Sequence, residues 1–284
     1  MAAPYPPQLT TPPNTARAHD RVTGVDVRID RVGTGKPVVF LNGLLGLNMH
    51  WFSCLGSLAQ THECIMLEPP LLEMRGKGCT VDSLLRLTMS LVESLIDQPA
   101  IFLGNSLGGH LCLRMALARP DLMRGFALIG SSGLFERGFE RDVQHNPSHE
   151  WLERKISGLF FDPSRVPPGA VDHAYQELQD RRRIRSLVKF GKSAKSDHLG
   201  DQLHKIETPA LVAWGQNDTV TPPEVAEEFH QGLRNSRLVW IPECGHAPQI
   251  EKPDALSKVI VQFVQDVDAG VPIGRDTTSQ TDVA

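Results

Sequence analysis

Residues 104–108 form the sequence Gly-Asn-Ser-Leu-Gly, which places Ser106 between two glycines at the spacing G-x-S-x-G. An apolar run at residues 101–103 precedes this motif, and a helical pattern that ends before Pro120 follows it. A strand, a tight turn and a helix are typical of a nucleophile elbow, whose strained turn holds the serine hydroxyl clear of the sheet. We therefore predict that Ser106 is a nucleophile. The alternative is a glycine-rich turn that happens to hold a serine.

A serine nucleophile needs a base to remove its proton and a carboxylate to orient that base. Asp218 follows the apolar run 210–214, and His246 follows the run 238–241. In open α/β sheets, sites form at the carboxyl ends of the strands, so both side chains are expected at that edge. The chain order Ser, Asp, His accompanies the G-x-S-x-G elbow. The sequence thus predicts a Ser106–His246–Asp218 triad, although each loop alone would also suit a turn-forming aspartate or a surface histidine.

Acyl transfer also needs two N–H donors for the negative charge that develops on the carbonyl oxygen. We expect one donor from the Leu107 amide, directly after the nucleophile, and the other from the Leu44 amide, in the loop after residues 37–41. Gly43 would let this loop run close to the serine. Asn42 would support the loop through its side-chain amide.

Apolar runs alternate with helical patterns, which indicates a mostly parallel sheet covered by helices on both faces. Residues 22–32 alternate apolar and polar side chains, as in an antiparallel strand near a sheet edge. Buried strands are predicted at residues 37–41, 64–67, 101–103, 126–129, 210–214 and 238–241. Helices are predicted at residues 81–96, 107–118, 223–233 and 253–267.

The alternation breaks between about residues 133 and 205, where no buried strand is evident. This break predicts a helical cap, residues 134–204, on a core formed by residues 21–133 and 205–268. Residues 1–20 and 269–284 are expected to be a flexible arm and a disordered tail. The substrate pocket is expected to be lined by cap side chains, each of which would also suit plain packing within the cap: Leu134, Phe135, Trp151, Leu159 and Phe160.

Composition excludes several classes of protein. The 284 residues carry 29 Lys and Arg against 33 Asp and Glu, a net charge of −4, which gives no case for nucleic acid or an anionic membrane. The run at residues 181–183, three arginines, is therefore interpreted as a solvated helix face rather than a contact for an anionic substrate or a nucleic acid. No apolar stretch approaches the roughly 18 residues of a membrane span, and the first residues lack the apolar region of a signal peptide.

Five scattered cysteines indicate free thiols in a reducing compartment, so we expect a cytoplasmic protein, a monomer or homodimer with a small-molecule substrate. No metal or cofactor is expected. His145 and His149 have the spacing of two metal ligands, but Pro147 between them argues against the helix that would align them. No glycine-rich dinucleotide loop opens the first unit, because the glycines at 104–109 serve the elbow.

On these residues the chain resembles an α/β-hydrolase with a helical cap, over about residues 22–267. The motifs at 104–109, 215–218 and 244–246 and the position of the cap are similar to the group that includes meta-cleavage-product carbon–carbon hydrolases and many small carboxylesterases. The resemblance implies the α/β-hydrolase fold, with a mostly parallel sheet of about eight strands, helices on both faces and a cap inserted after the sixth strand. It also implies hydrolase activity without a cofactor.

Two positions depart from the family pattern. Asn42-Gly43 stands where the family usually has His-Gly, and we expect the asparagine to keep the loop in place. Leu44-Leu45-Gly46 stands where carbon–carbon hydrolases often have Gly-Pro-Gly. This second departure favours a carboxylesterase with an apolar acyl pocket over carbon–carbon cleavage.

Three alternatives stay open. A carbon–carbon hydrolase would use the same triad, and polar cap residues such as Arg185 would then face the serine. A cofactor-free oxygenase or a perhydrolase is the second, and oxygenase activity would survive Ser106→Ala. The third is a non-catalytic ligand-binding protein that keeps the fold, which an intact set of Ser, Asp and His argues against.

Overall fold

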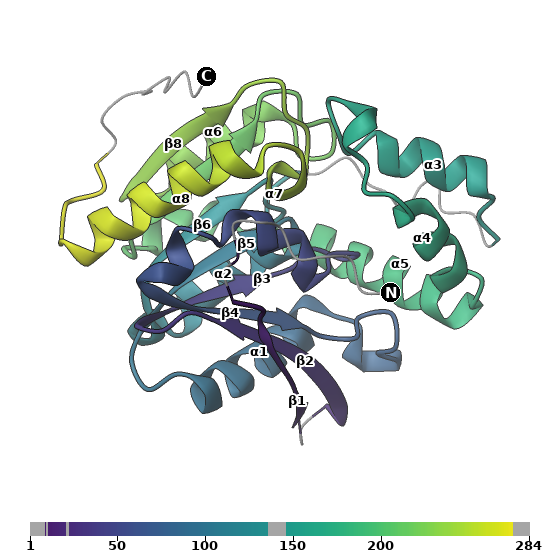
Figure 1. The fold of residues 1–284 in the computed structure, drawn as a ribbon, viewed down its shortest axis with the longest axis horizontal. Coiled ribbons are helices and arrows are strands. Elements are labelled where there is room, and N and C mark those ends of the chain that lie inside the picture. The colour runs from purple at the N-terminus through teal and green to yellow at the C-terminus, as the bar shows by residue number, and fades with distance from the viewer. Residues whose placement is uncertain (1–8, 10, 21–22, 136–145, 275–284) are drawn as a thin grey trace.

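The computed structural model describes residues 9, 11–20, 23–135 and 146–274. Eight strands form one sheet in the order β1-β2-β4-β3-β5-β6-β7-β8 (Figure 1). Strands β1 and β2 are antiparallel to their neighbours, whereas β3 to β8 are mutually parallel. The strands are β1 (Asn14–Asp20), β2 (Val25–Val32), β3 (Lys36–Leu41), β4 (His62–Glu68), β5 (Ala100–Asn105), β6 (Met123–Ile129), β7 (Ala210–Gly215) and β8 (Ser236–Ile241). This architecture confirms the predicted α/β-hydrolase fold class.

Helices cover both faces of the sheet (Figure 1). One face packs against α1 (Val81–Leu95), α2 (Leu107–Ala118) and α6 (Pro223–Gly232). The other face packs against the 3₁₀ helix η1 (Asn48–Cys54) and α8 (Pro253–Asp268). No helix in the described part of the chain combines the length and apolar character needed to cross a bilayer.

The central strands contribute side chains to both covered faces. In β3, Val39 and Leu41 join the core under α1 and α2, whereas Val38 and Phe40 join the core under η1 and α8. Successive side chains of a strand point to opposite faces, so a strand buried on both sides is a continuous apolar run. This is the pattern that identified these strands in the sequence.

Three helices lie between β6 and β7, at the right of Figure 1: α3 (His149–Ser157), α4 (Ala170–Glu177) and α5 (Arg181–Ser196). We call residues 146–200 the cap segment; residues 136–145 lie outside the described part. The cap segment has an apolar cluster of its own, against which Leu44 of the core packs. This cluster consists of Trp151, Leu152, Ala174, Leu178, Ile184 and Leu187.

The prediction of a flexible arm over residues 1–20 was wrong for residues 14–20, which form the edge strand β1. Every residue of β1 pairs with β2, and the Thr15 hydroxyl bonds to the buried Asp30 carboxylate. The Asp20 carboxylate accepts a hydrogen bond from the Thr23 amide (2.7 Å), as in a turn that an aspartate stabilises. Backbone pairing rather than apolar patterning holds this strand, so the periodicity did not reveal it. Residues 1–8 and 10 lie outside the described residues.

The predicted tail over residues 269–284 also needs a correction. Helix α8 ends at Asp268, but Ile273 is buried against the core under η1 and α8. Burial of the Ile273 side chain holds this residue against the core. Residues 275–284 lie outside the described part.

Candidate active site

Ser106 lies at the junction of β5 and α2, with backbone angles φ 54° and ψ −117°. A left-handed conformation at a residue other than glycine costs about 1–3 kcal/mol, so its surroundings must impose it. The Ser106 amide donates to the Ile129 carbonyl (3.1 Å), and the Ser106 carbonyl accepts from the Ser132 amide (3.1 Å). These bonds fix the turn between the ends of two parallel strands, as in a nucleophile elbow.

The glycines on either side of Ser106 are a steric requirement. A Cβ on Gly104 would lie 2.3 Å from the Gly108 carbonyl carbon, and a Cβ on Gly108 would lie 2.1 Å from the Leu41 carbonyl oxygen. Real Cβ atoms essentially never come so close to backbone atoms. The two glycines therefore let α2 start directly against β5 and β3.

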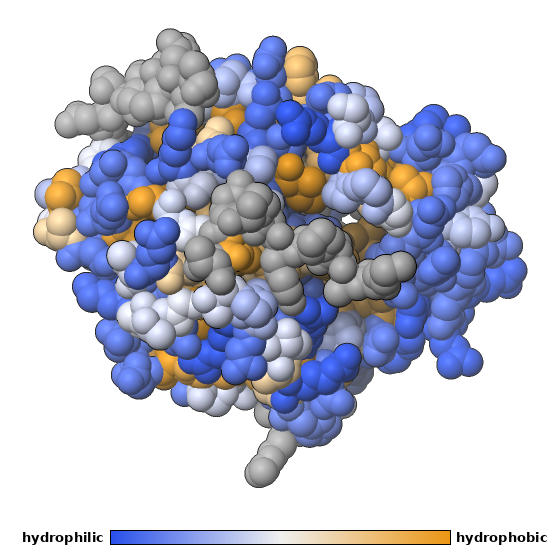
Figure 2. Space-filling view, viewed as in Figure 1, coloured by the Kyte–Doolittle hydropathy of each residue, from blue (hydrophilic) through white to orange (hydrophobic). Residues whose placement is uncertain are grey.

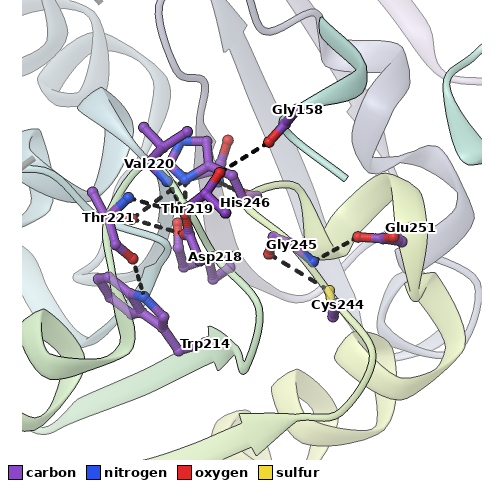
Figure 3. A network of polar contacts seen from close by, with 12 residues as sticks. Gly158, Trp214, Asp218, Thr219, Val220, Thr221, Cys244, Gly245, His246 and Glu251 are labelled. Atoms are coloured by element: carbon purple, nitrogen blue, oxygen red, sulfur yellow. Dashed lines mark hydrogen bonds and ion pairs between the residues drawn. The ribbon is translucent and has the colours of Figure 1, made fainter. Parts of the chain in front are cut away.

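Asp218 and His246 are in direct contact at the ends of β7 and β8. Oδ2 of Asp218 lies 2.8 Å from Nδ1 of His246, and both side chains are buried (Figure 3). Oδ1 of Asp218 accepts hydrogen bonds from the amides of Val220 (2.8 Å) and Thr221 (2.9 Å). The Thr221 hydroxyl donates to Oδ2 (2.8 Å). The carboxylate is thus fully engaged and aims one oxygen at the imidazole.

These contacts decide the charge of Asp218. Burial alone would raise the pKa of this carboxyl, but His246 and the donors of Thr221 outweigh burial and hold the pKa below its ordinary value. Asp218 is therefore a carboxylate at neutral pH. Since Nδ1 of His246 faces that carboxylate, the proton of a neutral imidazole belongs on Nδ1, which leaves Nε2 as the basic atom.

Asn105 joins the nucleophile turn to residues 242–247, the loop between β8 and α7 that contains His246 and that we call the histidine loop. Its side-chain nitrogen donates to the carbonyls of Ile129 (2.9 Å) and His246 (3.1 Å), and its oxygen accepts from Nε2 of Gln249 (3.1 Å). The residue next to the proposed nucleophile therefore contacts the proposed base. The sequence analysis missed Asn105, Gln249 and Thr221 as parts of the site. A hydroxyl three residues after Asp218 was a signal for Thr221, because Asp side chains commonly bond that locally.

The loop after β3 approaches Ser106 closely. A Cβ on Gly43 would lie 3.2 Å from Cβ of Ser106, so a glycine there keeps the space beside the serine free. The Leu107 amide is the first of α2 and has no partner within that helix. Within the described residues, neither the Leu107 amide nor the Leu44 amide donates to a backbone or side-chain acceptor. Both predicted oxyanion donors are thus unengaged in this structure.

Asn42 anchors the same loop from behind. Its side-chain nitrogen donates to Oδ1 of Asn48 (2.8 Å) and to the Leu67 carbonyl (3.0 Å). Its oxygen accepts from the indole N–H of Trp51 (2.9 Å). Asn48 in turn donates to the buried Asp30 carboxylate (2.9 Å). The asparagine that stands where the family usually has histidine is therefore satisfied in a buried polar network.

His50 closes the far end of this loop. Its Nδ1 accepts the Leu47 amide (3.2 Å), which requires an unprotonated Nδ1. Burial and the nearby His173 of α4 lower the pKa of His50 to about 4. The imidazole is therefore neutral at ordinary pH, and this loop contact persists down to acidic conditions.

The cap segment contacts the acid and base loops through backbone atoms. The His246 amide donates to the Leu159 carbonyl (2.7 Å), and the Thr219 hydroxyl donates to the Gly158 carbonyl (3.1 Å; Figure 3). A Cβ on Gly245 would lie 2.4 Å from the Leu159 carbonyl oxygen, so the two segments are in tight contact. The turn after α3 therefore lies directly over the histidine loop.

The predicted pocket residues occupy different places. Leu159 and Phe160 lie against the histidine loop, and Trp151 lies in the cap cluster on which Leu44 packs. Leu134 packs into the core under α1 and α2, and Phe135 is exposed. Apolar residues gather along the hollowed boundary between the cap segment and the core in Figure 2. Leu159 and Phe160 are thus the predicted pocket residues whose backbone contacts the loop of His246 directly.

Other candidates have structural partners instead. His149 contacts the Asp172 carboxylate (2.8 Å), whereas His145 lies outside the described residues. In the ranges that the structure covers, no three His, Cys, Asp or Glu side chains come together as a metal site would require. Burial raises the pKa of the Cys244 thiol, so it is no competing nucleophile. Arg185 is exposed, on the side of α5 away from its packed residues Ile184 and Leu187.

The fold and the elbow define an α/β-hydrolase. A model of the alpha/beta hydrolase family matches residues 38–259, and the chain belongs to this family. The sequence motifs and the fold therefore indicate the same family.

Relatives within the family have different named activities. The chain is 25% identical to a pimeloyl-[acyl-carrier protein] methyl ester esterase of Nitrosomonas europaea over 263 residues, which cover 86% of this chain and 98% of the esterase. It is 23% identical over 260 residues to a 2-hydroxy-6-oxo-6-(2'-aminophenyl)hexa-2,4-dienoic acid hydrolase of Metapseudomonas resinovorans, with coverage of 85% and 88%. The solved structure of MGS-MChE2, an alpha/beta hydrolase enzyme from a lagoon sediment metagenome, is similar with a TM-score of 0.69 and 28% identity, covering 85% of this chain and 96% of that enzyme. Hydrolase activity is common to these names, and the bond that is cleaved differs.

Proposed function

We propose that the protein is a serine hydrolase that cleaves carboxylic esters of small to medium acyl or aryl compounds. Ser106 is the nucleophile, His246 the general base and Asp218 the carboxylate that orients the base. The observation that carries this proposal is the 2.8 Å contact between the buried Asp218 and His246, beside a serine in the strained conformation of a nucleophile elbow.

In the first step, Nε2 of His246 takes the Ser106 proton as the serine oxygen attacks the ester carbonyl carbon. The tetrahedral intermediate collapses, the carbon–oxygen bond to the alcohol breaks, and His246 gives its proton to the departing alcohol. In the second step, His246 takes a proton from water as the water oxygen attacks the acyl-enzyme carbonyl carbon. The bond between the acyl carbon and the Ser106 oxygen then breaks, His246 returns its proton to that oxygen, and the acid is released. Asp218 stays ionised throughout and stabilises the imidazolium.

The negative oxygen of each tetrahedral intermediate would be held by the amides of Leu107 and Leu44. Their lack of a protein acceptor supports this role, because a donor engaged elsewhere would need to be released first. Gly43 leaves the space beside Ser106 that the acyl group needs. The proposed acyl pocket is apolar, with Leu134, Trp151, Leu159 and Phe160 as candidate lining residues.

Carbon–carbon cleavage is the second candidate, and the relative from Metapseudomonas resinovorans is the reason to keep it. An ester is favoured because Arg185, the cap arginine that could have faced the serine, is exposed, on the face of α5 away from Ile184 and Leu187. Leu44 and Leu45 also favour an ester, since they make the loop beside the serine apolar. A non-catalytic role would leave the engaged Asp218–His246 pair without a purpose.

The test is hydrolysis of p-nitrophenyl esters of increasing acyl length by the wild type and by Ser106→Ala. We expect wild-type turnover with an optimum at short to medium acyl chains and a loss of at least about 10⁴-fold in kcat/KM for the variant. Turnover that survives Ser106→Ala would refute the mechanism. Absence of turnover at every length, with cleavage of a vinylogous diketone instead, would establish the carbon–carbon alternative.

A further inference from the structure

Glu251 is a buried carboxylate that the proposed reaction does not use. It is the last residue of α7 (Pro248–Glu251), the short helix that begins two residues after His246, and it is only 1% exposed. Within the described residues, no lysine, arginine or histidine pairs with it, although its neighbour Lys252 lies 3.5 Å from Glu243. An unpaired buried charge is costly, so its retention needs a reason.

The two oxygens of Glu251 bind two different parts of the chain. Oε2 accepts the Gly245 amide (2.7 Å; Figure 3), which belongs to the histidine loop. Oε1 accepts the Asp162 amide (2.7 Å), which belongs to the cap segment. Both bonds are short and charge-assisted, the stronger kind of hydrogen bond. One carboxylate therefore links the cap segment to the residue directly before His246.

This link adds to one further contact between the cap segment and the loop of His246, and to one contact between that loop and β5. The His246 amide donates to the Leu159 carbonyl of the cap segment, and its carbonyl accepts from Asn105 of β5. His246 is therefore held through its amide by the cap, through its carbonyl by the strand of the nucleophile, and through its ring by Asp218. Loss of the cap contacts would release one of three restraints on the proposed base.

We propose that Glu251 is a positioning residue that ties the cap segment to the histidine loop, so that the placement of His246 depends on how the cap is docked. This inference rests on the proposed function, because it assigns a catalytic consequence to the position of His246. The chemistry of a carboxylate explains the choice of residue. Only an acidic side chain offers two strong acceptor oxygens and no donor to two N–H groups at once.

The test is Glu251→Gln, which replaces one acceptor oxygen by an NH₂ group that would face an N–H donor. Glu243→Gln makes the same chemical change at an exposed residue of the same loop and serves as the matched control. Active sites are counted by stoichiometric titration with a phosphonate that labels serine hydrolases, and kcat on p-nitrophenyl acetate is expressed per titrated site. We expect Glu251→Gln to lower this kcat about ten- to a hundredfold, with Glu243→Gln unchanged.

A purely structural role would give a different result: fewer titratable sites and an unchanged kcat per site, which would overturn the proposal. Hydrogen exchange provides a readout that does not depend on activity. We expect Glu251→Gln to speed exchange in peptides spanning residues 158–163 and 244–247 together, while residues 184–190 of α5 stay protected. Unchanged exchange at either peptide would also overturn the link. If the wild type fails to hydrolyse esters, the proposed function is wrong, and the exchange experiment still decides whether the link exists.

Discussion

The two sides of the proposed active site are stabilised in different ways. The oxyanion side, the loop of residues 42–50, is held by Asn42 and by a polar network that leads back through Asn48 to Asp30 of β2. The acid–base side, Asp218 and His246, is held by Thr221 and Asn105 of the core and also by the cap segment through Leu159. The polar contacts that hold the oxyanion side come from the core alone. Some of those that hold the acid–base side come from the cap segment.

This difference separates two tasks. Oxyanion donors must be preorganised before the substrate arrives, because they stabilise the developing negative charge most when they do not have to reorganise. A rigid network within the core suits that task. The base can tolerate a dependence on the cap, since the cap also encloses the substrate. Changes in the cap are therefore expected to alter proton transfer by His246 more than stabilisation of the oxyanion.

The largest effect is expected on the acid–base side, from Asp218→Asn. An amide keeps the shape of the carboxylate but favours the wrong tautomer of His246 and loses the charge that stabilises the imidazolium. We expect kcat to fall on the order of 10³–10⁴-fold with little change in KM for a p-nitrophenyl ester. Because the pKa of Asp218 is lowered, its stabilising contribution is present above its ordinary range and is lost as the pH falls through the lowered pKa. A kcat close to that of the wild type would remove Asp218 from the mechanism.

A smaller effect is expected on the oxyanion side, from Asn42→Ala. The change leaves the Trp51 indole N–H, Oδ1 of Asn48 and the Leu67 carbonyl without their Asn42 partner, which costs about 1–3 kcal/mol per buried group. We expect kcat to fall about ten- to a hundredfold and the unfolding temperature to drop by several degrees. Asn235→Ala, which removes a hydrogen bond on the surface, is the control. Unchanged kcat in a destabilised Asn42→Ala protein would limit the network to a structural role.

The last prediction concerns the pH dependence of stability rather than kcat, and His50→Asn tests it. The folded-state pKa of His50, about 4, lies below its ordinary value of 6.5. The unfolded chain therefore takes up this proton first as the pH falls, so stability is lost between about pH 6.5 and pH 4. Asparagine can still accept the Leu47 amide but does not titrate. Urea unfolding at pH values across this window measures the free energy of unfolding. Between about pH 6.5 and pH 4 the wild type is expected to lose more of it than the variant, by on the order of a few kcal/mol. Parallel curves would mean that His50 is not the titrating group.

Most of the core fold could be predicted because its strands are buried on both faces. The runs at residues 37–41 and 210–214 are apolar for that reason and fall within β3 and β7. Strand β1 escaped prediction because five of its seven residues are exposed, and the hydrogen-bond ladder to β2 holds it. A backbone ladder leaves little trace in side-chain periodicity.

In the candidate site, too, some residues could be predicted from the sequence and others could not. Ser106, Asp218 and His246 follow recognisable strands, and their chain order indicates a specific chemistry. Asn105 and Glu251 act through hydrogen bonds to residues that are distant in sequence, so no spacing rule singles them out. The placement of the pocket side chains depends on how the cap packs. Leu134 and Phe135 show this, because neighbours in the sequence differ in burial: Leu134 is in a core cluster and Phe135 is exposed.

The most direct test of the central mechanism is to trap the covalent intermediate. The protein is mixed with a p-nitrophenyl ester, quenched in acid within milliseconds and digested, and the peptide that contains residue 106 is weighed by mass spectrometry. We expect one acyl group on Ser106 in the wild type and none at this position in Ser106→Ala. Ester turnover without acylation of Ser106, or an acyl group on another residue, would contradict the proposed mechanism.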